Sequence, residues 1–210
     1  MKPILWSEVS FDAIADALAD YGFVIIDGFL NADEIHQLRE AIFLHQEEDN
    51  FKKAGIGNTH LLQVDKDIRG DYIKWIEPED ALPISQHFLN RIEDIRQQLN
   101  RSLFLSLKDF ECHYAIYPPG TFYEAHLDQF KSGESRKISI ACYLNQDWTP
   151  EQGGELGIHL EDGILKVEPL AGRIALFRSD TILHEVMRSH AQRFSITGWL
   201  RDQPLDLPYL

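Results

Sequence analysis

The sequence predicts a mainly β protein with supporting α-helices, whose core is a jelly roll or barrel-like sandwich. From Asp109 onward, eight short β-like runs are separated by turn signals such as Pro118-Pro119-Gly120 and Gly153-Gly154. Before Asp109, apolar residues recur mainly at helical spacing. A hydrophobic fraction of 44%, with 12 Phe, 7 Tyr and 4 Trp, is ample for one packed core.

Residues 1–108 are expected to form a helical support layer within the same domain as the core. Ser10 can cap the first helix, and Gly22 is a natural stop residue after it. Asn31 lies three residues before Glu34, which is the layout of a capping box at the start of the second helix. The predicted elements are helices over residues 11–21, 31–48 and 83–100 and a strand over residues 23–26.

Residues 51–75 are expected to form a mobile substrate loop. Residues 51–68 contain two glycines and three lysines without a sustained period, and the run Arg69-Gly70-Asp71-Tyr72-Ile73-Lys74-Trp75 follows. A structureless stretch of this length inside a compact domain is more often functional than a passive connector.

Residues 109–202 are expected to form the catalytic core, with residues 203–210 as a tail. The predicted core strands span residues 110–117, 122–128, 137–144, 156–160, 164–168, 173–177, 182–187 and 193–200.

Two histidines and one aspartate in these strands form a candidate metal site. His126 and Asp128 are separated by one residue, so on a strand both point to the same face, and His184 begins another predicted strand. Two imidazoles and one carboxylate suit Fe(II) and leave positions open for a co-substrate and dioxygen. A solvated surface pair is the alternative interpretation of His126 and Asp128, because short motifs of this kind often arise by chance.

The last predicted strand carries an arginine on a polar face. Arg193 alternates with Ser195 and Thr197, while Phe194 and Ile196 occupy the opposite face. A buried arginine needs a partner, and a dicarboxylic acid would supply one through two parallel hydrogen bonds. An exposed arginine on an edge strand is the alternative.

Tyr143 is one more candidate ligand-binding residue, whereas the other histidines are not candidate metal ligands. Tyr143 shares a face with Ser139 and Ala141, and it can donate to the same carboxylate as Arg193, although a strand tyrosine is more often core filler. No partner spacing suggests ligation by the other histidines, which are His36, His45, His60, His87, His113, His159 and His190.

Charge and cysteine content narrow the class of protein. A formal charge of −14 and a pI near 5.0 disfavour general binding to nucleic acid or to an anionic membrane. Residues 1–50 hold 11 acidic and 2 basic side chains, whereas residues 52–75 hold five basic and three acidic ones, which predicts a neutral to acidic substrate segment. Cys112 and Cys142 lie in apolar runs, as expected of reduced cytoplasmic thiols, and no leader or spanning segment is apparent.

Taken together, these residues resemble a known family. The sequence is similar to the 2-oxoglutarate- and Fe(II)-dependent prolyl 4-hydroxylases, particularly the group of hypoxia-inducible-factor prolyl hydroxylases and their bacterial relatives. The similarity extends from about Tyr21 to Arg201. It is carried by Tyr117-Pro118-Pro119-Gly120, Tyr123-Glu124-Ala125-His126-Leu127-Asp128, Tyr143-Leu144-Asn145-Gln146-Asp147-Trp148, Gly153-Gly154-Glu155-Leu156, His184-Glu185-Val186, residues 193–199, and the Ile68-Arg69-Gly70-Asp71 to Trp75-Ile76-Glu77 run.

The resemblance implies a double-stranded β-helix (a cupin-like jelly roll) with Fe(II) held by His126, Asp128 and His184. It further implies that 2-oxoglutarate and O2 are co-substrates, that succinate and CO2 are released, and that ascorbate can serve as reductant. The resemblance assigns 2-oxoglutarate binding to Arg193, Tyr143, Thr197, Tyr117 and Leu156, and the substrate loop and entrance to Asp71, Arg69, Arg136 and Trp199. It also suggests that Arg136 and Asp71 pair across the entrance.

Hydroxylation of a prolyl residue in a protein is therefore the leading functional hypothesis. The nearest alternative keeps the chemistry and acts on a free amino acid or small metabolite. A nucleic-acid demethylase is disfavoured, because Trp199 stands where those enzymes tend to carry a second arginine and the chain is acidic. A non-catalytic ligand-binding jelly roll is the alternative from another class, and the intact Arg193 argues against it.

Overall fold

A computed structural model describes residues 2–55, 69–79, 81–129 and 135–202. Its helices are α1 (Phe11–Asp20), α2 (Ala32–Glu47) and α3 (Pro83–Leu103), with a short 3₁₀ turn at Pro150–Gln152. Its strands are β1 (Ile4–Leu5), β2 (Phe23–Asp27), β3 (Lys52–Lys53), β4 (Tyr72–Trp75), β5 (Asp109–Tyr117), β6 (Tyr123–His126), β7 (Arg136–Tyr143), β8 (Leu156–Leu160), β9 (Gly163–Val167), β10 (Ile174–Arg178), β11 (His184–Val186) and β12 (Arg193–Arg201).

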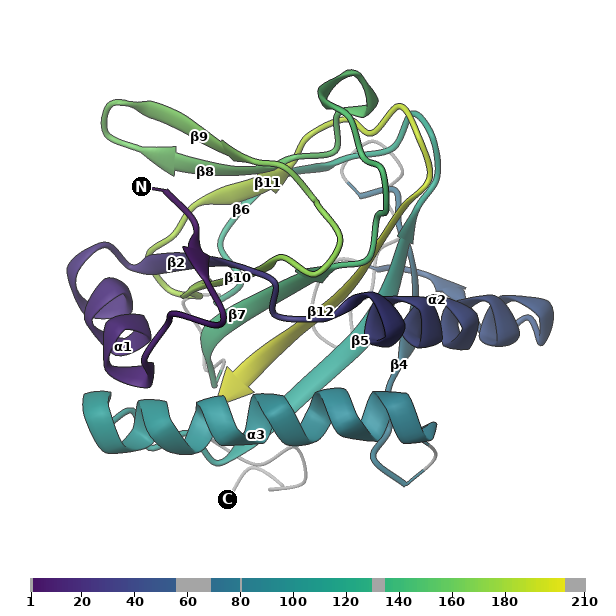
Figure 1. Cartoon of the computed structure of the whole chain (residues 1–210). Helices are drawn as coiled ribbons and strands as arrows, with labels where there is room; N and C mark the ends of the chain where they lie inside the picture. Colours follow the sequence, from purple (N-terminus) through teal and green to yellow (C-terminus); the bar gives the residue numbers. More distant parts are fainter. Residues whose placement is uncertain (1, 56–68, 80, 130–134, 203–210) are drawn as a thin grey trace.

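The strands form two facing sheets, which confirms the jelly-roll prediction. The larger sheet has the order β1-β2-β10-β7-β12-β5-β4-β3, and the smaller one has the order β6-β11-β8-β9. The eight strands that follow Asp109 divide four and four between the sheets, as in a double-stranded β-helix. In Figure 1 the helices lie along the outer side of the larger sheet, and the β8–β9 hairpin lies on the opposite side of the molecule.

Strand alternation divides the core into two layers. On β7, Ile140 and Cys142 pack toward the helices, whereas Ala141 and Tyr143 pack toward the smaller sheet. Strand β2 alternates in the same way, with Val24 on the helical side. The inner layer between the two sheets is therefore the space in which polar side chains of the large sheet can meet those of the small one.

Local signals position the helices as predicted. The Ser10 side chain accepts a hydrogen bond from the Ala13 backbone N–H, and Asn31 and Glu34 form a reciprocal capping box. Helix α3 continues three residues past the predicted end and stops at Phe104, which adopts a left-handed conformation (φ 53°). In the part of the chain that the structure describes, no helix has the length and apolar character needed to cross a bilayer.

The predicted strand over residues 23–26 is confirmed as β2, but β2 pairs with β10 inside the larger sheet and not with the helices of a separate support layer. The expectation of a structureless loop is wrong at both ends of that segment, because β3 at its start pairs with β4 at its end, and β4 pairs with β5. Residues 56–68 of that loop and the predicted tail, residues 203–210, lie outside the described residues.

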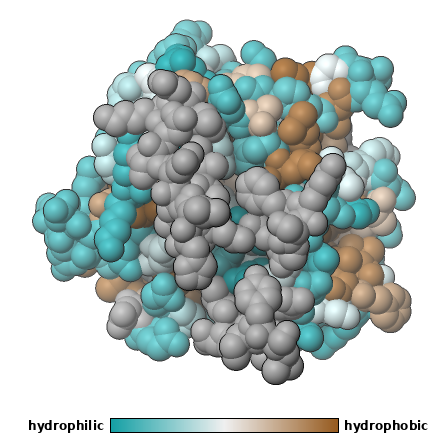
Figure 2. Space-filling view, turned by 180° about the vertical axis from the view of Figure 1, so that it is seen from behind, coloured by the Kyte–Doolittle hydropathy of each residue, from teal (hydrophilic) through white to brown (hydrophobic). Residues whose placement is uncertain are grey.

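The described surface has no single dominating apolar area on the face opposite to that of Figure 1. There, hydrophobic side chains form separate patches divided by hydrophilic ones (Figure 2). Scattered apolar residues of this kind are normal for a folded domain.

Candidate active site

His126, Asp128 and His184 converge between the two sheets. Strands β6 and β11 are antiparallel neighbours, and His184 lies directly opposite His126 in their register. Asp128 follows the end of β6, so a turn, and not strand alternation, brings its carboxylate to the histidines. One ligand atom from each of the three residues lies within 4.8 Å of the other two, so this cluster can hold a metal ion.

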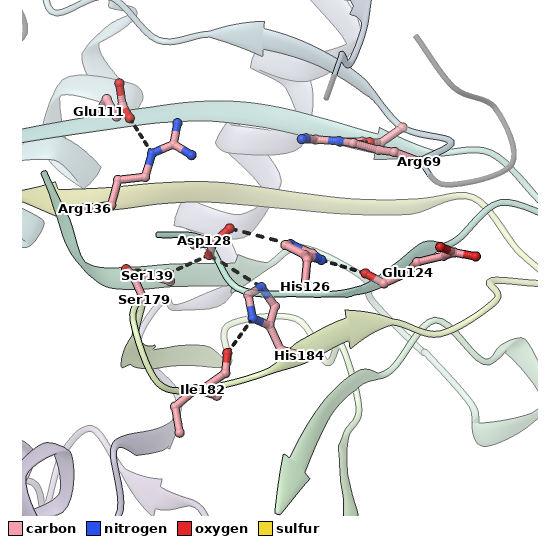
Figure 3. Close-up of polar contacts among 11 residues, drawn as sticks. Arg69, Glu111, Glu124, His126, Asp128, Arg136, Ser139, Ser179, Ile182 and His184 are labelled. Atoms are coloured by element: carbon pink, nitrogen blue, oxygen red, sulfur yellow. Dashed lines mark hydrogen bonds and ion pairs between the residues drawn. The ribbon is translucent and has the colours of Figure 1, made fainter. Parts of the chain in front are cut away.

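Contacts with backbone carbonyl oxygens orient both imidazoles toward the Asp128 carboxylate. The Nδ1 atoms of His126 and His184 lie 2.6 Å and 3.0 Å from the backbone oxygens of Glu124 and Ile182. Each Nδ1–H can therefore donate to a carbonyl, which leaves Nε2 with its lone pair. These Nε2 atoms lie 3.6 Å and 3.4 Å from the Asp128 carboxylate oxygens (Figure 3). This is the tautomer that metal binding requires.

A short hydrogen-bond chain of two serines supports the Asp128 carboxylate. The Ser139 hydroxyl donates to Asp128 Oδ2 at 2.6 Å, and Ser179 Oγ lies 2.8 Å from Ser139 Oγ (Figure 3). Burial alone would raise the pKa of Asp128, but the neighbouring imidazoles and the Ser139 hydroxyl hold it well below its usual range. Burial lowers the pKa of His184, against the opposing effect of Asp128. Both directions favour an ionised carboxylate beside a neutral imidazole, the state in which these groups bind metals.

Aromatic rings shield the cluster on two sides. The Tyr123 ring stacks on His126, with centroids 3.7 Å apart and planes 22° apart, and Phe177 lies 4.5 Å from His184. These contacts fix the ring orientations and limit the access of water. Glu185 points away and pairs with His159 at 3.0 Å, as expected from its alternation with His184.

Arg193 is a buried cation without an anionic partner among the described residues. Its side chain is 2% exposed, and its guanidinium donates to the Gly154 carbonyl at 2.8 Å and to Ser195 Oγ at 3.4 Å. Gly154 permits this approach: it adopts φ +69°, and a Cβ there would lie 3.0 Å from Arg193 Cδ. Since an arginine has five N–H donors and its charge is costly to bury, this site is suited to a carboxylate ligand.

Other predicted residues surround this arginine. The guanidinium carbon lies 5.1 Å from the ring centroids of both Tyr117 and Tyr143. The Tyr143 hydroxyl is buried and has no hydrogen-bond partner in the described part of the chain, although Arg193 lies nearby. Thr197 and Leu156 line the same pocket as Arg193 and the His–Asp–His cluster. An orphaned hydroxyl beside an unpaired guanidinium fits two oxygens of one bound carboxylate.

The predicted entrance residues lie nearby but pair differently from the expectation. Asp71 is fully buried and forms a two-point ion pair with Arg69, at 2.6 Å and 2.9 Å. Arg136 instead pairs with Glu111 at 3.0 Å (Figure 3) and lies 3.7 Å above the Trp199 ring. The expected Arg136–Asp71 pair is therefore wrong, because each group has a nearer partner that satisfies its charge.

Sequence reasoning missed several residues of the pocket. Ser139 was placed on the correct face but without its role as the donor to Asp128. His113, which showed no ligand spacing, lines the pocket together with Tyr117. Its position four residues before Tyr117 on one strand was the available signal, because alternate residues of β5 share a face.

Comparisons with known proteins agree with this geometry. A family model described as the 2OG-Fe(II) oxygenase superfamily matches residues 112–201. A solved prolyl-4-hydroxylase from Pseudomonas putida is 37% identical, with a TM-score of 0.84, and the match covers 93% of this chain and all of that one. A prolyl hydroxylase from Trichoplax adhaerens, solved with a peptide fragment of the hypoxia-inducible-factor oxygen degradation domain, is 26% identical over 91% of this chain and 89% of that one, with a TM-score of 0.82.

Human Egl nine homolog 1 is 28% identical over 209 residues, which cover 96% of this chain and 49% of the human protein. The chain thus spans about half the length of that relative.

Proposed function

The chain belongs to the 2OG-Fe(II) oxygenase superfamily, and from this premise we propose that it is a 2-oxoglutarate- and Fe(II)-dependent dioxygenase that hydroxylates a prolyl residue of a protein. One oxygen atom of O2 enters a prolyl C–H bond, which becomes C–OH. The other enters the keto acid, which becomes succinate and loses CO2. The observation that carries this proposal is the buried, unpaired Arg193 in one pocket with the His–Asp–His cluster.

The residues of the chain have distinct roles in this proposal. His126, Asp128 and His184 would hold Fe(II), since two imidazoles and one carboxylate are a ligand set that suits this ion. Bound Fe(II) and 2-oxoglutarate supply the oxidative chemistry. Arg193 binds the distal (C5) carboxylate of 2-oxoglutarate, assisted by the Tyr143 hydroxyl.

The pocket walls complete the keto-acid site. Thr197 adds a polar group to the lining of the pocket, and Tyr117 and Leu156 line it as well. Because the walls are largely apolar, they exclude water from the bound co-substrate and strengthen the contact between guanidinium and carboxylate.

A prolyl substrate is supported by the named relatives, since both the Pseudomonas putida and the Trichoplax adhaerens proteins are prolyl hydroxylases. Asp71, Arg69 and Trp199 line the pocket on the side of β4, and Arg136 covers Trp199, so these residues form the proposed entrance. The basic balance of residues 52–75 supports a neutral to acidic peptide.

The proposal also covers the cellular compartment and the reductant. The buried free thiols of Cys112 and Cys142 support a reducing, cytoplasmic compartment. Ascorbate is the proposed reductant that keeps iron in the Fe(II) state.

The test is incubation of the protein with Fe(II), 2-oxoglutarate, O2 and a proteome-derived peptide library, followed by mass spectrometry. The expected product is a peptide 16 Da heavier on proline, formed together with succinate. Succinate formation with oxidation confined to other residues or to free metabolites would contradict the prolyl assignment. No 2-oxoglutarate turnover in the presence of any of these substrates would contradict the enzymatic proposal as a whole.

A further inference from the structure

His113 lies on β5, an interior strand of the large sheet, and faces the pocket. On one side it pairs in register with Trp75 of β4, and on the other with Thr197 of β12. It is 1% exposed and lines the same pocket as Arg193 and the His–Asp–His cluster. The function proposed above gives this histidine no role.

The His113 imidazole has neither of its possible hydrogen bonds. Both ring nitrogens are buried and without a partner in the described part of the chain. Burial lowers the pKa of His113 to about 3, with the charges of Arg69 and Arg136 acting in the same direction and those of Asp71 and Asp128 opposing it. The ring is therefore neutral at physiological pH, with one N–H donor and one nitrogen acceptor. A buried histidine that serves only to stabilise the fold is expected to satisfy at least one of these groups.

A second unpaired donor lies beside it. The Nε1–H of Trp199 is also buried without a partner among the described residues, and the Trp199 ring lies 5.5 Å from the His113 ring. Arg136 covers Trp199 but is already neutralised by Glu111. The two orphaned rings thus offer two N–H donors and one acceptor without net charge, which suits a neutral amide better than a carboxylate.

The Trp75 ring closes this subsite toward solvent. It meets His113 edge-on at 4.9 Å and is 37% exposed, at the end of β4. The nitrogens of His113 are out of contact with water, so a ligand that binds them has to displace the half-exposed Trp75 ring. The energy lost by leaving these groups unpaired in the free protein is then recovered in the complex.

We propose that His113 and Trp199 form an amide-recognition subsite that hydrogen-bonds the main chain of the peptide substrate at the peptide bond following the target proline. This inference rests on the proposed prolyl hydroxylase function. The bond before a proline has no N–H, whereas the bond after it offers both a carbonyl oxygen and an N–H. Only the latter therefore supplies an N–H that can donate to the acceptor nitrogen of the His113 ring.

The test compares binding of two probes to the full chain loaded with Mn(II) and 2-oxoglutarate under nitrogen. One probe is a blocked peptide that the library experiment shows to be hydroxylated, and the other is its ester analogue at the bond after proline. His113→Phe keeps the ring shape and removes both nitrogens, and His113→Asn restores a donor and an acceptor. His36→Phe, at an exposed position of α2, is the matched control.

We expect His113→Phe to weaken peptide binding by ~5- to 10-fold, the factor for one neutral hydrogen bond in a buried site. The same variant should bind amide and ester probes equally, whereas the wild-type protein should prefer the amide. His113→Asn should recover most of the lost affinity, and His36→Phe should match the wild type. In calorimetry without peptide, all variants should bind 2-oxoglutarate with similar affinity.

Stability supplies an independent readout. Without ligands, His113→Phe should unfold at the wild-type temperature or ~2 to 4 °C above it, because it removes unsatisfied buried nitrogens. A clear fall in unfolding temperature would assign His113 a structural role and overturn the inference. Unchanged peptide affinity, or equal loss of peptide and 2-oxoglutarate binding, would also overturn it. If the wild-type protein hydroxylates peptides and His113→Phe binds them normally, the inference alone fails, whereas absence of prolyl hydroxylation by the wild-type protein refutes the proposed function itself.

Discussion

Replacement of Arg193 by methionine should change ligand affinity and protein stability in opposite directions. The guanidinium is 2% exposed and has two uncharged acceptors, the Gly154 carbonyl and the Ser195 hydroxyl. Methionine has a similar length and is apolar, so it fills the same volume without the charge. A group retained only for the fold would lose stability on this change, whereas a group retained for an anionic ligand would not.

The magnitudes follow from the contacts. A charge-assisted hydrogen bond contributes about 1.5 to 3 kcal/mol, so loss of two such bonds to a carboxylate should weaken 2-oxoglutarate binding by ~10²- to 10⁴-fold. In the free protein, the change replaces an unpaired buried cation by an apolar side chain. This should leave the free energy of unfolding unchanged or raise it by about 1 to 3 kcal/mol.

Calorimetric titration of 2-oxoglutarate into the Mn(II)-loaded protein, combined with thermal unfolding of the ligand-free protein, measures both effects. Arg39→Met is the matched control, because Arg39 contacts Phe194 from the helical side of the same strand and donates to the Leu144 carbonyl. It should leave the affinity for 2-oxoglutarate unchanged. If the affinity of Arg193→Met for 2-oxoglutarate stayed within about threefold of the wild-type value, the assignment of the carboxylate site would be refuted. A threefold loss is smaller than the loss expected from removing a single hydrogen bond to a charged group.

Three further predictions concern the surroundings of this site. Ser139→Ala should weaken Mn(II) binding by ~10-fold in a metal titration, because the Asp128 carboxylate loses its supporting donor; an unchanged affinity would contradict that role. Asp71→Asn should lower the free energy of unfolding, measured by urea denaturation, by about 3 kcal/mol, since it leaves the Arg69 guanidinium without its buried partner. A loss below about 0.5 kcal/mol would show that this ion pair does not contribute significantly to stability. The pKa of His113 is about 3 in the folded protein and about 6.5 in the unfolded chain. The free energy of unfolding of the wild type should therefore fall as pH decreases from 6.5 toward 3, by up to about 1.4 kcal/mol per pH unit. His113→Phe should show a smaller fall over that window, and parallel curves would contradict the buried neutral ring.

Short-range patterns predicted much of this molecule. Ser10 and the Asn31–Glu34 pair marked helix starts correctly, because capping involves neighbours within one turn. The period of two along a strand separated Ala141 and Tyr143 from Ile140 and Cys142, and it placed Arg193 on the inner face. These predictions depend on backbone geometry that each segment carries by itself.

The amino-acid sequence by itself therefore determined the ligand types, the faces they occupy and the family resemblance that joins them. The tertiary structure alone decided which groups meet across strands: Arg136 with Glu111 and not Asp71, and Trp75 beside His113 through the pairing of β4 with β5. The physical reason is that pairing depends on the register of strands far apart in the chain and on which charged neighbour lies nearest once they are aligned. Neither is encoded in the spacing of any one segment.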